Sequence, residues 1–363
     1  MLATLPDPAQ PMDLSVLGAG AWGIVLGSHL ARKGHRVTAW DAAPQVIESL
    51  RTLRGHPKLK GFVVPKELRL VVSLAEALDA PRPTCFVVAV PSHALRTLAE
   101  EVRQLDSTEP TAPWVLCSKG IEEETLLTMT GVVEAVRGVE WRERLAVLSG
   151  PSFAAEVGTD KPTTVCVASA NKTLAVWAQT VFRTETFRVY TQDDVLGVQL
   201  GGSLKNVIAI ASGVCDGMKL GDNARAALIT RGLAEMVRLG VAMGAKAETF
   251  AGLAGMGDLI LTCAGEQSRN HQFGELLAQG RPASEALRQI GMVVEGARTV
   301  RSVRALAVRH GVEMPISNAV YEMLYEDKHP ANALRDLLRR DPHPTTWEGR
   351  TQPLQMEPPF GRY

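Results

Sequence analysis

One glycine pattern constrains this chain more than any other feature of its sequence. The apolar run Leu14–Leu17 leads directly into Gly18, Gly20 and Gly23, spaced as G-x-G-x-x-G, and residues 24–33 then continue with helical periodicity. In that setting the first glycine permits a tight turn, the second admits a pyrophosphate, and the third lets the helix pack closely on the strand. The helix N-terminus favours phosphate. The pattern predicts dinucleotide binding; a glycine-rich turn without a ligand is the alternative.

The first half of the chain alternates short apolar or β-branched runs with helix-like stretches. This alternation predicts a doubly wound, mostly parallel sheet of the Rossmann type. Several runs are apolar at consecutive positions, as expected for strands covered on both faces. The runs are Leu14–Leu17, Arg36–Trp40, Leu68–Val72, Cys85–Val90, Trp114–Cys117, Leu145–Leu148 and Thr163–Ala168.

The alternation stops near Gln192, and longer stretches with apolar residues at helical spacing follow it. We therefore predict an all-helical C-terminal domain over residues 192–342, after a dinucleotide-binding domain over residues 12–191. The ends, 1–11 and 343–363, carry clustered prolines and polar residues, and we expect flexible tails there. The expected helices are Val195–Val214, Ala224–Gly244, Glu295–Arg309 and Asn318–Tyr325.

Charge and composition exclude several classes of function. The 363 residues include 39 Lys or Arg and 39 Asp or Glu, so no global basic field favours nucleic acid or an anionic membrane. Five dispersed cysteines without a C-x-x-C pair predict reduced core residues rather than disulfides or a zinc site. No apolar run approaches the roughly 20 residues of a membrane span, and residues 1–11 lack a signal-peptide pattern. We expect no metal, no nucleic acid, no membrane span and a cytoplasmic location.

An acidic residue follows the second predicted strand. Asp41 lies about 20 residues beyond the glycine loop, where a carboxylate accepts hydrogen bonds from the adenosine ribose. A 2′-phosphate would meet this negative charge, and Ala42 supplies no cation in compensation. Asp41 therefore favours NAD over NADP; the alternative is a solvated turn aspartate.

Two lysines occupy positions that are unusual for a surface cation. Lys119 follows the predicted strand Trp114–Cys117, at the sheet edge where open α/β folds bind ligands, and it can point into that crevice. Lys205 lies inside the most apolar helical stretch of the second half, and burial would lower its pKa into a range useful for proton transfer. A lysine in a surface turn and a lysine whose head reaches water are the respective alternatives.

Two further motifs in the second half carry polar groups. Asp258 lies in Gly-Met-Gly-Asp, where it can accept hydrogen bonds from substrate hydroxyls, hold Lys205 in place, or cap a helix. Ser268, Arg269 and Asn270 place hydroxyl, guanidinium and amide side by side, which resembles an anion clamp. Ser268 could instead cap the helix that begins near Asn270.

Together these motifs are distinctive in their order and spacing. They closely resemble the bacterial NAD(P)-dependent glycerol-3-phosphate dehydrogenase family over roughly residues 12–339. The motifs that carry the resemblance are Gly18–Gly23, Ser118–Gly120, Gly150–Ala154, Gly202–Asn206, Gly221–Asn223, Ala226–Glu235, Gly255–Asp258, Ser268–Asn270 and Val294–Gly296.

The resemblance implies hydride transfer between a nicotinamide cofactor and C2 of sn-glycerol 3-phosphate, which interconverts it with dihydroxyacetone phosphate and supplies phospholipid synthesis. By motif position Lys205 resembles the general acid/base. The positions that resemble substrate contacts are Lys119, Gly150, Ser152, Lys205, Asp258, Ser268, Arg269 and Asn270, with Arg269 and Asn270 at the phosphate. The predicted cofactor contacts are Gly18, Gly20, Ala21, Trp22, Gly23, Asp41, Lys119, Ala154, Arg269, Val293 and Glu295.

The cofactor is therefore NAD or NADP. Many members of the family that use NADPH carry Arg or His two residues after the tryptophan of the second strand, whereas Trp40 is followed here by Asp41 and Ala42. By analogy we expect a homodimer. Two alternatives stay open at this point: a two-domain dehydrogenase of a β-hydroxyacid or sugar acid, and a non-catalytic NAD-binding regulator, neither of which explains residues 268–270.

Overall fold

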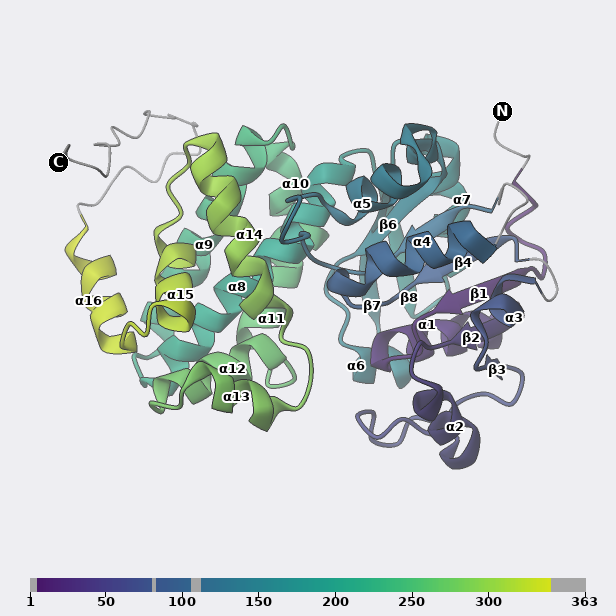
Figure 1. The fold of residues 1–363 in the computed structure, drawn as a ribbon, viewed down its shortest axis with the longest axis horizontal. Coiled ribbons are helices and arrows are strands. Elements are labelled where there is room, and N and C mark those ends of the chain that lie inside the picture. The colour runs from purple at the N-terminus through teal and green to yellow at the C-terminus, as the bar shows by residue number, and fades with distance from the viewer. Residues whose placement is uncertain (1–4, 80–82, 106–111, 341–363) are drawn as a thin grey trace.

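The computed structural model describes residues 5–79, 83–105 and 112–340, and it consists of a sheet domain and a helical domain (Figure 1). The eight strands lie in the order β3-β2-β1-β4-β5-β6-β7-β8, and all neighbours are parallel except β6 and β7. The predicted fold class is therefore confirmed. The strands are β1 (Asp13–Leu17), β2 (Arg36–Trp40), β3 (Arg69–Val71), β4 (Cys85–Val88), β5 (Trp114–Leu116), β6 (Leu145–Ser149), β7 (Thr163–Ser169) and β8 (Phe187–Gln192).

Each of the seven predicted runs overlaps one strand, whereas β8 was not predicted. In β8, buried Phe187 and Val189 alternate with exposed Arg188 and Tyr190. The strand lies at the edge of the sheet, so it lacks the continuous apolar run that identified the buried strands.

Helices cover both faces of the sheet and form two apolar cores, as expected for a doubly wound fold. The helices α1 (Ala21–Arg32), α2 (Pro44–Leu53) and α7 (Lys172–Phe182) bury their apolar residues in one core. The other contains residues from α3 (Leu74–Asp79), α4 (Leu95–Leu105) and α5 (Met129–Arg137).

The strand order reverses beside β1, because the chain moves from β1 to β2 and β3 on one side and then crosses to β4 on the other. The loops that leave β1 and β4 therefore diverge at the carboxyl ends of the strands, where ligands of open α/β sheets bind. Gly18, at the end of β1, has a φ of +102°, and a Cβ there would lie 2.9 Å from the carbonyl carbon of Ala89. Only glycine suits both this backbone conformation and this close approach.

A central helix organises the second domain. Helix α8 (Val195–Gly217) is buried over most of its length and is surrounded by other helices (Figure 1). By length and composition α8 could cross a membrane, but 89% of its apolar window is buried inside the protein. Around or beyond it lie α9 (Asp222–Ala242), α10 (Ala247–Ala251), η3 (Leu253–Gly257), α11 (Asp258–Ala264), α12 (Arg269–Ala278), α13 (Ala283–Ile290), α14 (Glu295–His310), α15 (Pro315–Tyr325) and α16 (Pro330–Arg339).

The expected N-terminal tail is only partly described, and the described part is attached to the sheet domain. Trp177 on α7 donates a hydrogen bond from Nε1 to the carbonyl oxygen of Pro6 (2.8 Å), and Leu5 packs against the apolar core. The expected C-terminal tail, 343–363, lies outside the described residues. All five cysteines are buried and unpaired. Within the described ranges, no three His, Cys, Asp or Glu side chains are grouped so as to hold a metal ion.

Candidate active site

The glycine loop forms an open cradle at the N-terminus of α1. No side chain caps this helix, and its first hydrogen bond runs from the Ile24 N–H to the Gly20 carbonyl (2.9 Å). A Cβ on Gly20 would meet no atom within 4 Å, so the space above the loop is open, whereas a Cβ on Gly23 would lie 1.8 Å from the Gly18 oxygen. An uncapped helix end with open space above it fits the pyrophosphate of a dinucleotide.

Asp41 is attached to the same loop. Its Oδ2 accepts a hydrogen bond from the Ala19 N–H (2.8 Å), and its Oδ1 accepts one from the Ala43 N–H (3.0 Å). Each carboxylate oxygen can accept a further hydrogen bond. The side chain is therefore held at the loop rather than free in solvent, and its remaining lone pairs suit ribose hydroxyls.

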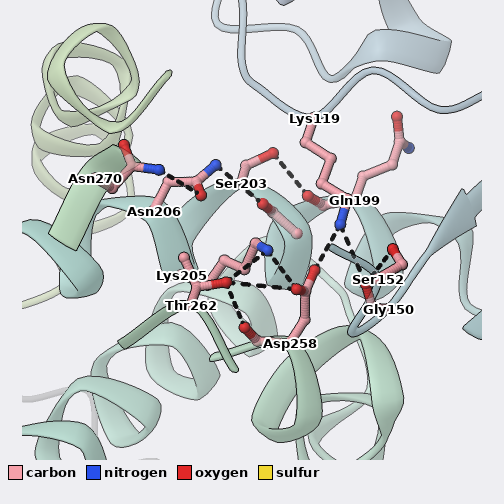
Figure 2. Close-up of polar contacts among 11 residues, drawn as sticks. Lys119, Gly150, Ser152, Gln199, Ser203, Lys205, Asn206, Asp258, Thr262 and Asn270 are labelled. Carbon is pink, nitrogen blue, oxygen red and sulfur yellow. Dashed lines mark hydrogen bonds and ion pairs between the residues drawn. The ribbon is translucent and has the colours of Figure 1, made fainter. Parts of the chain in front are cut away.

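Three predicted residues, one from the sheet domain and two from the helical domain, meet at one carboxylate (Figure 2). Lys205 Nζ donates a hydrogen bond to Oδ1 of Asp258, and Lys119 Nζ donates one to Oδ2 of the same carboxylate (2.6 Å). The Asp258 side chain is 2% exposed. Among the roles considered for Asp258, the structure supports the one in which it holds Lys205. Both lysines bind this carboxylate, so neither is a free surface cation.

Two glycines on α8 allow these groups to converge. A Cβ on Gly201 would lie 2.5 Å from the carbonyl oxygen of Ala254, in the segment that leads to Asp258. A Cβ on Gly202 would lie 2.8 Å from Ser149 Oγ and 3.4 Å from Cδ of Lys119. The helix can therefore approach both segments one turn before Lys205.

The environment of Lys205 is suited to proton transfer. Its side chain is 8% exposed, and burial lowers its pKa to about 8, an effect that Asp258 opposes and the charge of Lys119 reinforces. A pKa near neutrality lets one group donate and accept protons with comparable ease. Two ammonium groups around one carboxylate leave a net positive charge, which favours an anionic substrate.

Thr262 completes the environment of Lys205, although the sequence analysis did not select it. The Lys205 ammonium donates to Thr262 Oγ1 (2.8 Å), while that hydroxyl donates to the backbone carbonyl of Asp258 (2.6 Å). The spacing of four residues between Asp258 and Thr262 on α11 was the available signal, because such residues share one helix face.

The predicted loop after β6 lies next to Lys119. Ser152 Oγ donates to the Gly150 carbonyl (3.0 Å), which Lys119 Nζ also approaches at 3.4 Å. Ala154 is the first residue of the short helix α6 (Ala154–Gly158). These contacts connect the loop at the carboxyl end of β6 to the lysine–aspartate cluster.

The trio at residues 268–270 is built into the start of α12. Ser268 is the N-cap of α12 and accepts a hydrogen bond from the His271 N–H (3.3 Å), so the capping reading is confirmed. Asn270 donates to Oδ1 of Asn206 (3.0 Å) and accepts from the Gly296 N–H (2.9 Å). Asn206 adjoins Lys205, so Asn270 is tied to the part of α8 that carries Lys205.

The predicted cofactor residues near α14 join this assembly. Arg269 donates a hydrogen bond to the Val293 carbonyl (2.8 Å), and its side chain remains exposed. Glu295, the first residue of α14, accepts a hydrogen bond from Ser92 Oγ in the sheet domain (2.8 Å). Ser92 was not among the predicted site residues, because nothing in the linear chain relates it to Glu295.

Comparison with known proteins agrees with this geometry. Models of the NAD-dependent glycerol-3-phosphate dehydrogenase N-terminus and C-terminus match residues 13–175 and 194–335. A glycerol-3-phosphate dehydrogenase (NAD(P)+) from Anaeromyxobacter dehalogenans (strain 2CP-C) is 47% identical over 334 residues, which cover 92% of this chain and 99% of that protein. The chain belongs to the NAD-dependent glycerol-3-phosphate dehydrogenase family.

Other members of the glycerol-3-phosphate dehydrogenase family give the same result. A relative from Geobacter sulfurreducens (strain ATCC 51573 / DSM 12127 / PCA) with the same name is 47% identical over 92% of this chain and 99% of its own. The crystal structure of glycerol-3-phosphate dehydrogenase from Coxiella burnetii superposes with a TM-score of 0.85, at 38% identity, over 91% of this chain and 99% of that one. The protein is thus an NAD(P)-dependent oxidoreductase of this family.

Proposed function

We propose that this protein interconverts dihydroxyacetone phosphate and sn-glycerol 3-phosphate, with NADH or NADPH as the reductant. The observation that carries the assignment of roles is the buried Lys205, whose ammonium binds the carboxylate that Lys119 of the sheet domain also binds. We propose residues 12–191 as the dinucleotide-binding domain and residues 192–342 as the catalytic domain.

The nicotinamide ring, when bound, supplies or takes the hydride at C2 of the substrate. In the reducing direction Lys205 donates a proton from Nζ to the carbonyl oxygen, and in the oxidising direction its neutral amine takes the proton of the C2 hydroxyl. Asp258 and Thr262 use two of the donor directions of Nζ, which leaves the third for the substrate oxygen.

The substrate phosphate requires a cationic, polar pocket. Arg269 and Asn270 are proposed to hold it, with Ser268 at the same helix N-terminus, where phosphate is favoured. Lys119, Gly150 and Ser152 would then contact the remainder of the substrate. The net positive charge of the lysine–aspartate cluster favours an anionic substrate.

The cofactor would lie across the loop of Gly18, Gly20 and Gly23, with Ala21 and Trp22 at the helix N-terminus. Asp41 would accept hydrogen bonds from the adenosine ribose, and Arg269, Val293 and Glu295 would contact the cofactor from the helical domain. Lys119 and Ala154 would line the nicotinamide end. With Asp41 at the ribose, NADH is expected to serve at least as well as NADPH.

The first experiment follows the absorbance of the reduced nicotinamide after the purified protein is mixed with dihydroxyacetone phosphate and either NADH or NADPH. Oxidation of both, with NADH at least as efficient, supports the function and the role of Asp41. If a folded sample binds NADH but does not oxidise it in the presence of dihydroxyacetone phosphate, the proposed substrate is contradicted. An advantage of about tenfold or more in kcat/KM for NADPH would contradict the role of Asp41.

The cellular setting is also part of this proposal. Glycerol 3-phosphate made by the enzyme would supply phospholipid synthesis from the cytoplasm, and the enzyme would act as a homodimer. Light scattering of the purified protein at several concentrations tests the dimer, since a constant monomer mass would contradict it.

A further inference from the structure

The β5–α5 connection, residues 117–128, belongs to the sheet domain by sequence but is fastened to the helical domain. Ile121 contributes to the apolar core of the helical domain, and its carbonyl accepts a hydrogen bond from Ser302 Oγ on α14 (3.2 Å). Glu123 accepts hydrogen bonds from Arg298 (2.7 Å) and Arg301 (3.0 Å), also on α14. Lys119 is part of this connection, so contacts with the other domain influence where its ammonium lies.

The first turn of α5, directly after the connection, is held by a buried amide. Gln199 on α8 accepts a hydrogen bond from the Thr130 N–H at Oε1 (2.9 Å), and its Nε2 donates to Thr130 Oγ1 (2.9 Å). The same Nε2 also approaches the Val195 carbonyl at 3.3 Å. Gln199 is 5% exposed and Thr130 is 7% exposed, so water does not compete for these hydrogen bonds.

Gln199 lies between the start of α8 and the catalytic lysine on the same helix. It lines a small recess between the domains together with Lys119, Ser149 and Gly202. At Gly202 the helix carries no side chain that could hold the Lys119 stem in place. The reciprocal hydrogen bonds of Gln199 and Thr130 supply, one turn earlier, a directional contact between α8 and the start of α5, to which the segment that carries Lys119 leads.

We propose that Gln199 and Thr130 are positioning residues: their buried hydrogen bonds fix α8 against the first turn of α5, where the β5–α5 connection ends, and thereby place Lys205 and Lys119 on the two oxygens of Asp258. This inference rests on the proposed function, because it assigns the aligned lysines their task in that reaction. Gln199 acts through the lysines and does not itself contact the reacting atoms.

The test uses Gln199→Met, which keeps a similar volume but cannot form the hydrogen bonds, with Thr130→Val and the double variant. Misplacement of catalytic groups by about 1 Å is costly, so kcat should fall about 10- to 100-fold in each single variant. The double variant should be little worse than either single variant, because both remove the same contact. The Kd for NADH should change less than about twofold, since the glycine loop is untouched.

The pH profile gives a readout that a purely structural role would not move. The charge of Lys119 is one of the factors that lower the pKa of Lys205. Displacement of Lys119 from Asp258 should therefore shift the inflection pH in the profile of kcat/KM for the reducing reaction. In a crystal structure of Gln199→Met, the distance from Lys119 Nζ to Asp258 Oδ2 should exceed 2.6 Å.

Ser169→Ala is the matched control. The buried Ser169 hydroxyl donates to the Leu145 carbonyl (2.7 Å), at the end of β6 remote from the crevice. If Gln199→Met loses stability as Ser169→Ala does, yet keeps the wild-type kcat, pH profile and lysine–aspartate distances, the inference is overturned. Absence of activity in the wild type would contradict the proposed function instead, and the crystal structure of Gln199→Met would still decide the positioning role.

Discussion

Lys205 and Lys119 bind the same carboxylate but reach it from different kinds of structure. Lys205 projects from the middle of a buried helix and its side chain is 8% exposed, whereas Lys119 projects from the loop after β5 and is 21% exposed. Burial lowers the pKa of Lys205 to about 8, against the opposing effect of Asp258. Position in the fold, rather than residue type, therefore separates a proposed acid/base from a proposed electrostatic anchor.

Replacement of the buried lysine tests this comparison most severely. In Lys205→Met we expect kcat to fall by about 10²- to 10⁴-fold, the usual contribution of general acid–base catalysis. The free energy of unfolding at pH 7 should rise, because burial of the ammonium opposes folding and Lys119 remains as an ion-pair partner of Asp258.

Kinetics and urea unfolding on the same samples check both parts of this prediction. Lys246→Met is a suitable control, since Lys246 is an exposed lysine that pairs with Asp193 at the surface. Substantial turnover in Lys205→Met would assign proton transfer to another group and remove the distinction between the two lysines.

Replacement of the loop lysine should have a smaller effect. In Lys119→Met we expect kcat/KM to fall by about 10- to 100-fold, as for the loss of one charged hydrogen bond to the substrate. Because Lys119 helps to lower the pKa of Lys205, the pH at which the reducing reaction declines should move upward. A lower kcat/KM with an unchanged pH profile would show that the two lysines are not electrostatically coupled.

The pH dependence of the wild type sharpens the contrast further. Reduction needs the Lys205 ammonium, so its kcat/KM should decline as the pH rises through about 8, while oxidation needs the neutral amine and should increase over the same range. Profiles in both directions, measured at saturating cofactor, check this expectation. If kcat/KM changes with pH in opposite senses for the two directions, one group serves as both acid and base. If it changes in the same sense, Lys205 is not the proton-transfer group.

A second buried carboxylate, Glu235, provides a comparison for Asp258. Instead of two lysines, the N-terminus of α15 binds it, with hydrogen bonds from the Ile316 N–H (2.6 Å) and from the Ser317 N–H (3.1 Å) and hydroxyl (3.0 Å). Burial raises the pKa of Glu235 to about 6 from an ordinary 4.5. The folded protein therefore binds the proton more tightly, and stability is lost as the pH rises from 4.5 to about 6.

That loss should amount to about 2 kcal/mol in the wild type and should be absent from Glu235→Gln. Unfolding of both proteins in urea at several pH values isolates the contribution, because other groups titrate equally in each. Activity at neutral pH should not change, since Glu235 lies away from the lysine–aspartate cluster. An identical pH dependence of the two unfolding free energies would show that the carboxylate does not titrate in this range.

The elements of the fold that could be predicted are those identified by residues close together in the sequence. Strand β2 begins and ends as predicted, at Arg36 and Trp40, because its apolar run and its flanking residues lie within one short segment. Strand β8 was missed, since an edge strand is exposed on alternate residues. The sequence left two interpretations of Ser268 open, an anion-binding residue or a helix N-cap. The hydrogen bond from the His271 N–H shows that Ser268 caps α12.

The sequence alone determined the glycine loop, the alternation that builds the sheet, the helical second domain and the resemblance to a dehydrogenase family. These depend on backbone conformation and periodicity, which act over a few residues. The tertiary structure decided that Lys119 and Lys205 share Asp258, although 139 and 53 residues separate them from it. The energy of that arrangement comes from burial and from charges brought together by packing, and neither quantity is encoded in sequence spacing.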